Sequence, residues 1–186
     1  MSTRNMSTRN MSMRDLALAA CVVALAFGAG AANAQSPHLG KPIGQTDLAE
    51  WDINILPDGS NLPPGSGKAA DGVKVFADKC ALCHGDHGQG GHAARLIGGP
   101  AKASLDGGKT IANYWPQATT LFDFIRRAMP FTQPRSLTDQ EVYSLVAYLL
   151  AANKLIGEDD EMNATTLPKV RMPNRDNFVV QFPDRI

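Results

Sequence analysis

Two cysteines and a histidine lie within five consecutive residues, Cys80-Ala81-Leu82-Cys83-His84. The spacing C-x-x-C-H is the attachment signature of a c-type haem, whose vinyl groups take the two thiols and whose iron takes the histidine. A zinc knuckle would need further ligands, and no cysteine follows Cys83. A thioredoxin-like redox site would need a βαβ context, which the sequence pattern does not show. The motif therefore predicts one covalent haem c held by Cys80, Cys83 and His84.

The first 34 residues have the pattern of a secretory signal peptide. Three arginines, the last of them Arg14, precede an apolar run from Leu16 to Ala32, and Ala32-Asn33-Ala34 is an A-x-A cleavage site. We expect residues 1–34 to be removed, which predicts a periplasmic protein with no membrane span after cleavage. Cys21 resembles a lipoprotein cysteine, but most of the apolar run follows it, so we do not favour lipidation.

The charge of the chain argues against one class of partner. It carries 18 basic and 18 acidic residues, and removal of residues 1–34 takes away three arginines and one aspartate. The remainder is slightly negative, so we expect no nucleic-acid binding.

Composition divides the remaining chain into three segments. Residues 35–65 are rich in proline, glycine, asparagine and aspartate and predict an extended N-terminal arm. Residues 66–155 carry the helical patterns and predict the cytochrome domain, and residues 156–186 predict an extended C-terminal tail. For Trp51 in the arm, we prefer packing against its own domain over contact with a partner.

Two helices are predicted to cross within this domain. Ser66 is a candidate N-cap for a helix over 67–81, in which Gly72, Phe76 and Cys80 share one face. A capping box at Thr138 to Glu141 predicts a second helix over 139–152. We expect Leu145 and Tyr148 of the second helix to meet Gly72 and Phe76 of the first.

The glycine-rich residues 85–113 are expected to wrap the haem. Gly98-Gly99-Pro100 is a candidate source of the carbonyl that accepts the Nδ1–H of His84. Arg95 is a candidate partner for a haem propionate, and Trp115 is a further candidate haem contact. We expect His87 and His92 to be exposed and not to bind the iron.

A third helix is predicted to lead into the sixth iron ligand. A capping-box-like start at Thr120 is followed by an apolar stripe of Leu121, Phe124, Ile125 and Ala128. The helix ends at Met129-Pro130, because proline disfavours helical backbone in the residue before it. Met129 is therefore our candidate for the sixth ligand, with a core-filling methionine as the alternative.

The tail combines prolines with exposed-looking apolar residues such as Val170, Phe178 and Phe182. It must fold back along the domain or lie on another protein. We predict the second, so that truncation after Gly157 leaves a folded cytochrome and weakens only partner binding.

The order of helix, C-x-x-C-H, glycine-rich loop, helix, Met-Pro and capped helix resembles a class I cytochrome c over residues 66–152. A narrower resemblance, to the cytochrome c subunit of bacterial sulfite and sulfur dehydrogenases, runs from Trp51 to Phe178. It is carried by Trp51-Asp52-Ile53, Leu62 to Gly67, Tyr114-Trp115-Pro116, Ala118 to Phe131 and Arg171 to Arg175. The resemblance implies an all-α fold, with three main helices around one haem c and extended N- and C-terminal arms. Some members carry a second haem domain, whereas the single C-x-x-C-H here resembles the single-haem form.

That family implies a non-catalytic electron-transfer subunit. Its partner is a molybdenum-cofactor dehydrogenase subunit that oxidises sulfite or protein-bound sulfane sulfur, and its electrons go to a downstream cytochrome c. One alternative is a freely diffusing periplasmic carrier for another dehydrogenase or terminal oxidase, against which the arm and the apolar tail argue. Another is a haem enzyme or gas sensor, against which Met129 argues because an occupied axial position blocks binding to the iron.

Overall fold

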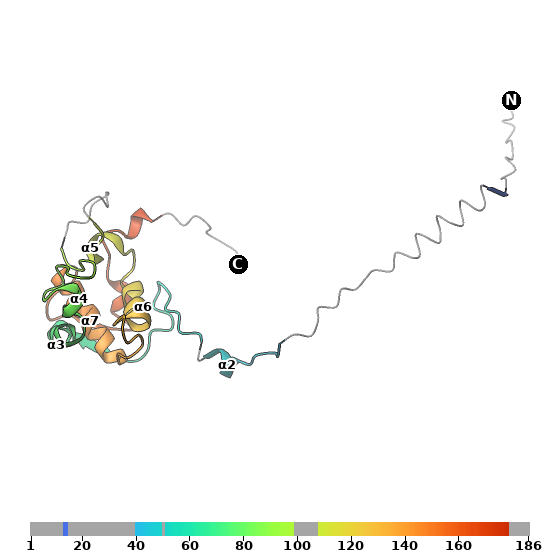
Figure 1. Ribbon diagram of the computed structural model, residues 1–186, viewed down its shortest axis with the longest axis horizontal. Coiled ribbons are helices and arrows are strands. Elements are labelled where there is room, and N and C mark those ends of the chain that lie inside the picture. Colours follow the sequence, from blue (N-terminus) through green and yellow to red (C-terminus); the bar gives the residue numbers. More distant parts are fainter. Residues whose placement is uncertain (1–12, 15–39, 50, 99–107, 179–186) are drawn as a thin grey trace, which may run out of the picture. The chain divides into compact units, whose positions relative to one another are not determined.

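The computed structural model describes residues 13–14, 40–49, 51–98 and 108–178, so most of the predicted signal peptide and the end of the tail lie outside the described residues. The chain divides into two units, Met1–Gln45 and Thr46–Ile186, and the second contains the folded domain. Figure 1 shows the helices of the domain, and its two short strands form a two-stranded sheet. The elements are α2 (Gln45–Ala49), β1 (Ser66–Lys68), α3 (Ala69–Lys79), α4 (Ala81–His84), α5 (Ile111–Tyr114), α6 (Ala118–Ala128), α7 (Asp139–Ala152), β2 (Glu161–Asn163) and the 3₁₀ turns Leu167–Lys169 and Arg175–Asn177. None of the helices in the described ranges is long and apolar enough to cross a membrane.

Helix α7 is the centre of the domain, and its predicted bounds are confirmed. Its first turn is closed by the predicted capping box, in which Glu141 N–H donates to Thr138 Oγ1 at 3.2 Å and Thr138 N–H donates to Glu141 Oε2 at 2.9 Å. Nine of its residues are buried. The helix contacts α3, α6 and β1 (Figure 1). Because neighbouring elements cover most of its sides, most of its sides are apolar.

The crossing of α3 and α7 depends on Gly72, which lies nearest to Ser144 and to the predicted Tyr148 of α7. A Cβ atom at Gly72 would lie 2.0 Å from the backbone oxygen of Ser144 on α7. The ring of Phe76, one turn further along α3, packs against Tyr148 with centroids 5.1 Å apart. Only a residue without a side chain permits the two backbones to approach this closely.

The start of α3 differs from the prediction. Ser66 is not a helix cap, because it lies in β1, which pairs antiparallel with β2 and places Gly67 opposite Met162. The helix begins at Ala69 and ends at Lys79, where Cys80 breaks it from α4. The strand partner comes from about a hundred residues further along the chain, which local capping rules do not consider.

The predicted role of the tail is wrong for residues 161–172. Met162, Leu167, Val170 and Met172 are at most 9% exposed and belong to the core of the domain itself. The segment folds back along the domain instead of leaving its apolar side chains for a partner. Val179, Val180 and Phe182 lie outside the described residues.

Helix α6 begins earlier and faces differently than expected. It starts at Ala118, and Thr120 lies inside the helix instead of capping it. Phe122 is fully buried with its ring 4.5 Å from that of Tyr143, whereas Phe124 is 41% exposed. Leu121 and Ile125 are buried as predicted. The core-facing side of the helix therefore includes Phe122 and excludes Phe124.

The N-terminal arm is attached to the domain at several points. Tyr143 Oη donates to the carbonyl oxygen of Pro63 at 2.9 Å, and desolvation by burial raises the pKa of Tyr143 to about 12. Ile55 is buried, but Trp51 is 81% exposed. Our preference for packing of Trp51 against its own domain is therefore wrong.

Candidate haem site

The cysteine motif lies on a single short helical turn. Backbone bonds from Cys83 N–H and His84 N–H to the carbonyl oxygen of Cys80, at 3.2 and 3.0 Å, close this turn. Positions i, i+3 and i+4 of a helix share one face. Both thiols and the imidazole are thus presented to the same side of α4.

The imidazole of His84 is oriented by a backbone carbonyl. Its Nδ1 lies 2.8 Å from the oxygen of Ala94, and a proton donated there leaves Nε2 as the nitrogen available to a metal. The predicted carbonyl source, Gly98-Gly99-Pro100, is therefore wrong. Gly98 instead donates its N–H to Asn153, while Gly99 and Pro100 lie outside the described residues.

The loop after His84 folds back onto the motif. Ala93 N–H donates to the carbonyl oxygen of Cys83 and Gly90 N–H donates to that of His84, both at 2.8 Å. Gly91 approaches so closely that a Cβ atom there would lie 2.9 Å from Cys83 O. These contacts hold Ala94 in position, because they tie the loop residues just before it to α4, the helix that carries His84.

Asn153 holds the far end of this loop and is a site residue that the sequence patterns did not predict. At the C-cap of α7, its Nδ2 donates to the carbonyl oxygen of Leu96 at 3.3 Å, and its Oδ1 accepts from Gly98 N–H at 3.1 Å. An asparagine directly after a helix is a common capping signal. Nothing in that signal points to a loop 55 residues earlier.

The two thiols differ in their exposure to solvent. Both Cys80 and Cys83 are free, and Cys80 is partly buried whereas Cys83 is exposed. Desolvation by burial raises the pKa of Cys80 to about 11. In the described part of the chain, no three His, Cys, Asp or Glu residues are grouped so as to hold a metal ion.

Met129 lies at the break that the sequence predicts. It is the C-cap of α6 with an extended backbone, φ −118° and ψ 148°. Its side chain is half-buried against the core, whereas Met162 and Met172 are buried within it. Of these three methionines, Met129 therefore has the most accessible side chain.

The other residues considered for the haem site lie in different parts of the domain. Arg95 follows Ala94 in the loop and is exposed. Trp115 is half-buried, with its ring 5.9 Å from Tyr114 and 5.6 Å from Phe124. His87 and His92 are exposed, as predicted.

The donor set fits a haem c. Two free thiols, an imidazole with an oriented ring and a half-buried thioether are the groups that such a haem uses. Several apolar side chains pack against the core but remain only half-buried. A flat apolar group that covered these side chains would remove more of their surface from water. They are Leu96, Ile97, Trp115, Met129 and Tyr148.

This architecture has a close counterpart among solved structures. A chain in the crystal structure of the sulfane dehydrogenase SoxCD from Paracoccus pantotrophus is 37% identical and superposes with a TM-score of 0.70, over 79% of this chain and 72% of that chain. The sequence model of the cytochrome c family matches residues 69–153. The chain belongs to the cytochrome c family. Membership implies a covalently bound haem c and a role as an electron carrier, and the predicted class I cytochrome c fold is confirmed.

Two curated relatives of this cytochrome c are named thiosulfate dehydrogenase. The thiosulfate dehydrogenase of Stutzerimonas stutzeri (strain A1501) is 34% identical over 90 residues, which are 47% of this chain and 28% of that protein. The thiosulfate dehydrogenase of Psychrobacter arcticus (strain DSM 17307 / VKM B-2377 / 273-4) is 36% identical over 84 residues, 42% of this chain and 24% of that protein. The matched residues thus span about a quarter of the length of each relative, 28% of one and 24% of the other.

Proposed function

We propose that this cytochrome c accepts electrons from a molybdenum-containing sulfite or sulfur dehydrogenase subunit and passes them to a downstream cytochrome c in the periplasm. The observation that carries the proposal is the similarity to a chain of SoxCD, a sulfane dehydrogenase, over most of both chains. The relatives named thiosulfate dehydrogenase support a role in sulfur oxidation.

The proposed site residues divide into attachment, ligation and support. Cys80 and Cys83 would form the thioethers, and His84 and Met129 would hold the iron. Arg95 would pair with a propionate, and Trp115 would contact the haem. When bound, the haem would supply a one-electron couple, and ligation by a thioether and an imidazole favours the reduced state more than ligation by two nitrogens does. Ala94 fixes the ring of His84 at the Nδ1 atom, so that Nε2 keeps one orientation through each cycle.

The exposed arm supports a bound subunit over a freely diffusing carrier. An 81% exposed tryptophan is unusual on a protein that works alone. The alternative is a soluble periplasmic carrier for another dehydrogenase or terminal oxidase.

Purification from the native host tests the proposal. We expect the cytochrome to co-purify with a larger subunit that contains molybdenum, and its haem to be reduced on addition of sulfite or thiosulfate. A cytochrome that elutes alone, and whose haem stays oxidised with both substrates in the periplasmic extract, would favour the freely diffusing carrier.

The segment boundaries of the precursor belong to the same proposal. We propose removal of residues 1–34 on export, an arm over 35–65 and a haem domain that begins at residue 66 and includes the folded-back residues 161–172. Amino-terminal sequencing and intact mass of the periplasmic protein should give a chain that begins at Gln35 and carries one haem resistant to acid-acetone extraction.

A further inference from the structure

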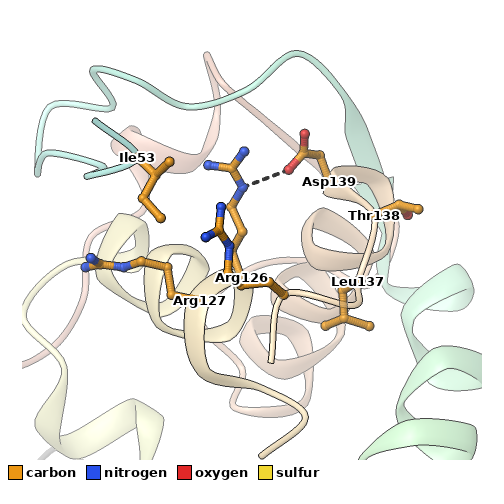
Figure 2. A pocket seen from close by; sticks show the side chains of 7 residues that line it. Ile53, Arg126, Arg127, Leu137, Thr138 and Asp139 are labelled. Atoms are coloured by element: carbon orange, nitrogen blue, oxygen red, sulfur yellow. Dashed lines mark hydrogen bonds and ion pairs between the residues drawn. The ribbon is translucent and has the colours of Figure 1, made fainter. Parts of the chain in front are cut away.

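A pocket lined by three arginines opens between the N-terminal arm, α6 and the start of α7 (Figure 2). Its volume is about 360 Å³. Figure 2 shows Arg126 directed toward Asp139, with Ile53 across the opening from α7. We call this site the arginine pocket; its polar and charged lining is Arg126, Arg127, Arg135, Thr138 and Asp139.

The arginine pocket keeps an uncompensated positive charge. Arg126 Nε donates to Asp139 Oδ1 at 2.9 Å, and Arg127 pairs with Asp123 one turn earlier on α6. Arg135 is exposed and has neither an ion pair nor a hydrogen bond within the described part of the chain. Two of the three guanidinium groups are thus neutralised, and the third is available to a carboxylate from outside.

Arg127 also lines a second, more apolar pocket. Its volume is about 400 Å³, and Trp115, Phe124 and Ala128 form most of its apolar lining. We call it the aromatic pocket. Arg127 lines both pockets, so the two are neighbours on the same surface. An exposed phenylalanine on a half-buried tryptophan beside an arginine has the composition of an interface hot spot.

The exposed tryptophan of the arm belongs to the same region of the chain. Trp51 is two residues before Ile53, which lines the arginine pocket. A tryptophan ring can bury on the order of 200 Å² of surface, and here 81% of the residue is left to solvent. It adds an exposed apolar side chain two residues along the chain from the arginine pocket.

The position of the two pockets relative to Met129 gives them a function. Ala128 of the aromatic pocket is followed directly by Met129, the proposed sixth ligand. A partner seated on α6 therefore contacts the chain next to Met129, which would hold the haem iron.

We propose that the arginine pocket and the aromatic pocket form the docking face for the catalytic subunit of the dehydrogenase, which presents an acidic segment with an apolar side chain. The inference rests on the proposed function and names the surface through which it operates. A carboxylate of the partner pairs with Arg135, and its apolar side chain enters the pocket beside Phe124. Such complementarity raises the association rate and makes it sensitive to salt.

Stopped-flow reduction of the holo-cytochrome by the catalytic subunit from the native host, with sulfite or thiosulfate as the donor, tests the docking face. The variants are Arg135→Glu and Phe124→Ser. Their matched controls are Lys74→Glu and Val73→Ser, at exposed positions on α3, which contributes no residue to either pocket. We expect Arg135→Glu to lower the second-order rate constant about tenfold at low ionic strength, with the difference lost at high salt. Phe124→Ser should lower it at both salt concentrations, and the controls should match the wild type.

The outcomes separate the two proposals. Reduction of every variant by ascorbate at the wild-type rate shows that the haem is intact. If the wild type is not reduced by the catalytic subunit, the proposed function fails and the docking face with it. If the wild type is reduced but Arg135→Glu is no slower than Lys74→Glu, the proposed function stands and the docking face is wrong.

Discussion

Substitution of Gly72 by alanine should force α3 and α7 apart. The added Cβ would lie 2.0 Å from the carbonyl oxygen of Ser144, 2.6 Å from its carbonyl carbon and 2.7 Å from Cβ of Tyr148. Ordinary contacts of a Cβ begin near 3.4 Å, so the two helices must separate by more than 1 Å. The atoms in the way are mostly backbone, which cannot rotate aside. The Phe76–Tyr148 contact beside the crossing must also loosen.

The expected cost follows from two opposing effects. Overpacking of a core costs about 1–3 kcal/mol or more, and a clash with backbone belongs at the upper end. Alanine in place of glycine favours an isolated helix by about 1 kcal/mol. We therefore expect a net loss of about 2 kcal/mol or more, which lowers the melting temperature by roughly 4–8 °C in a domain of this size.

Thermal unfolding of the haem-loaded protein, followed by far-ultraviolet circular dichroism and by haem absorbance, measures this loss. Gly157→Ala is the matched control, because its Cβ would meet only the flexible carboxylate of Asp160, at 3.2 Å. The control should stay within about 0.5 kcal/mol of the wild type. A Gly72→Ala protein that is as stable as the wild type, or more stable, would refute the close approach of the two helices. Only the higher helix propensity of alanine would then affect the stability.

Three further predictions concern the iron ligand, an ion pair and the tail. Met129→Ala should abolish the weak sulfur-to-iron absorption band, lower the reduction potential and open the iron to carbon monoxide. The control Met172→Leu should retain the band. If the band persists in Met129→Ala, the sixth ligand is Met162 or Met172 instead. The pKa of Glu141 is lowered below its usual 4.5, first by the hydrogen bond from Lys79, at 2.6 Å, and then by that from Thr138 N–H. The contribution of Glu141 to the free energy of unfolding is therefore full above pH 4.5 and is lost as the pH falls through the lowered pKa. Because the pair is partly exposed, Glu141→Gln should cost only about 0.5–1 kcal/mol at pH 7 and nothing near pH 2, as measured by urea unfolding; an equal cost at both values would contradict this linkage. Truncation after Gly157 removes four buried apolar side chains at about 1.5–3 kcal/mol each, a sum that rivals the whole stability of a domain. We therefore expect loss of cooperative unfolding. A truncated protein with the wild-type melting temperature would instead support the prediction that the tail lies on another protein.

Chemistry carried by adjacent residues could be predicted from the sequence. The C-x-x-C-H motif, the capping box at Thr138 and the break at Met129-Pro130 each depend on atoms only a few positions apart. The close approach at Gly72 was also predictable, because helical spacing placed it on the same face as Phe76 and Cys80. In each case, the geometry follows from the local backbone.

Contacts between distant segments were decided only in the tertiary structure. Ser66 satisfies the rules for a helix cap, yet its backbone pairs with β2 because a strand almost a hundred residues later lies beside it. Phe122 and Phe124 are alike in sequence, and only the position of Tyr143 determines which of them is buried. Any carbonyl of a glycine-rich loop can accept from His84, and the bonds of Ala93 and Asn153 select Ala94. Local sequence determines what each residue can bond to, whereas the partner it bonds to depends on which segments the packed core brings together.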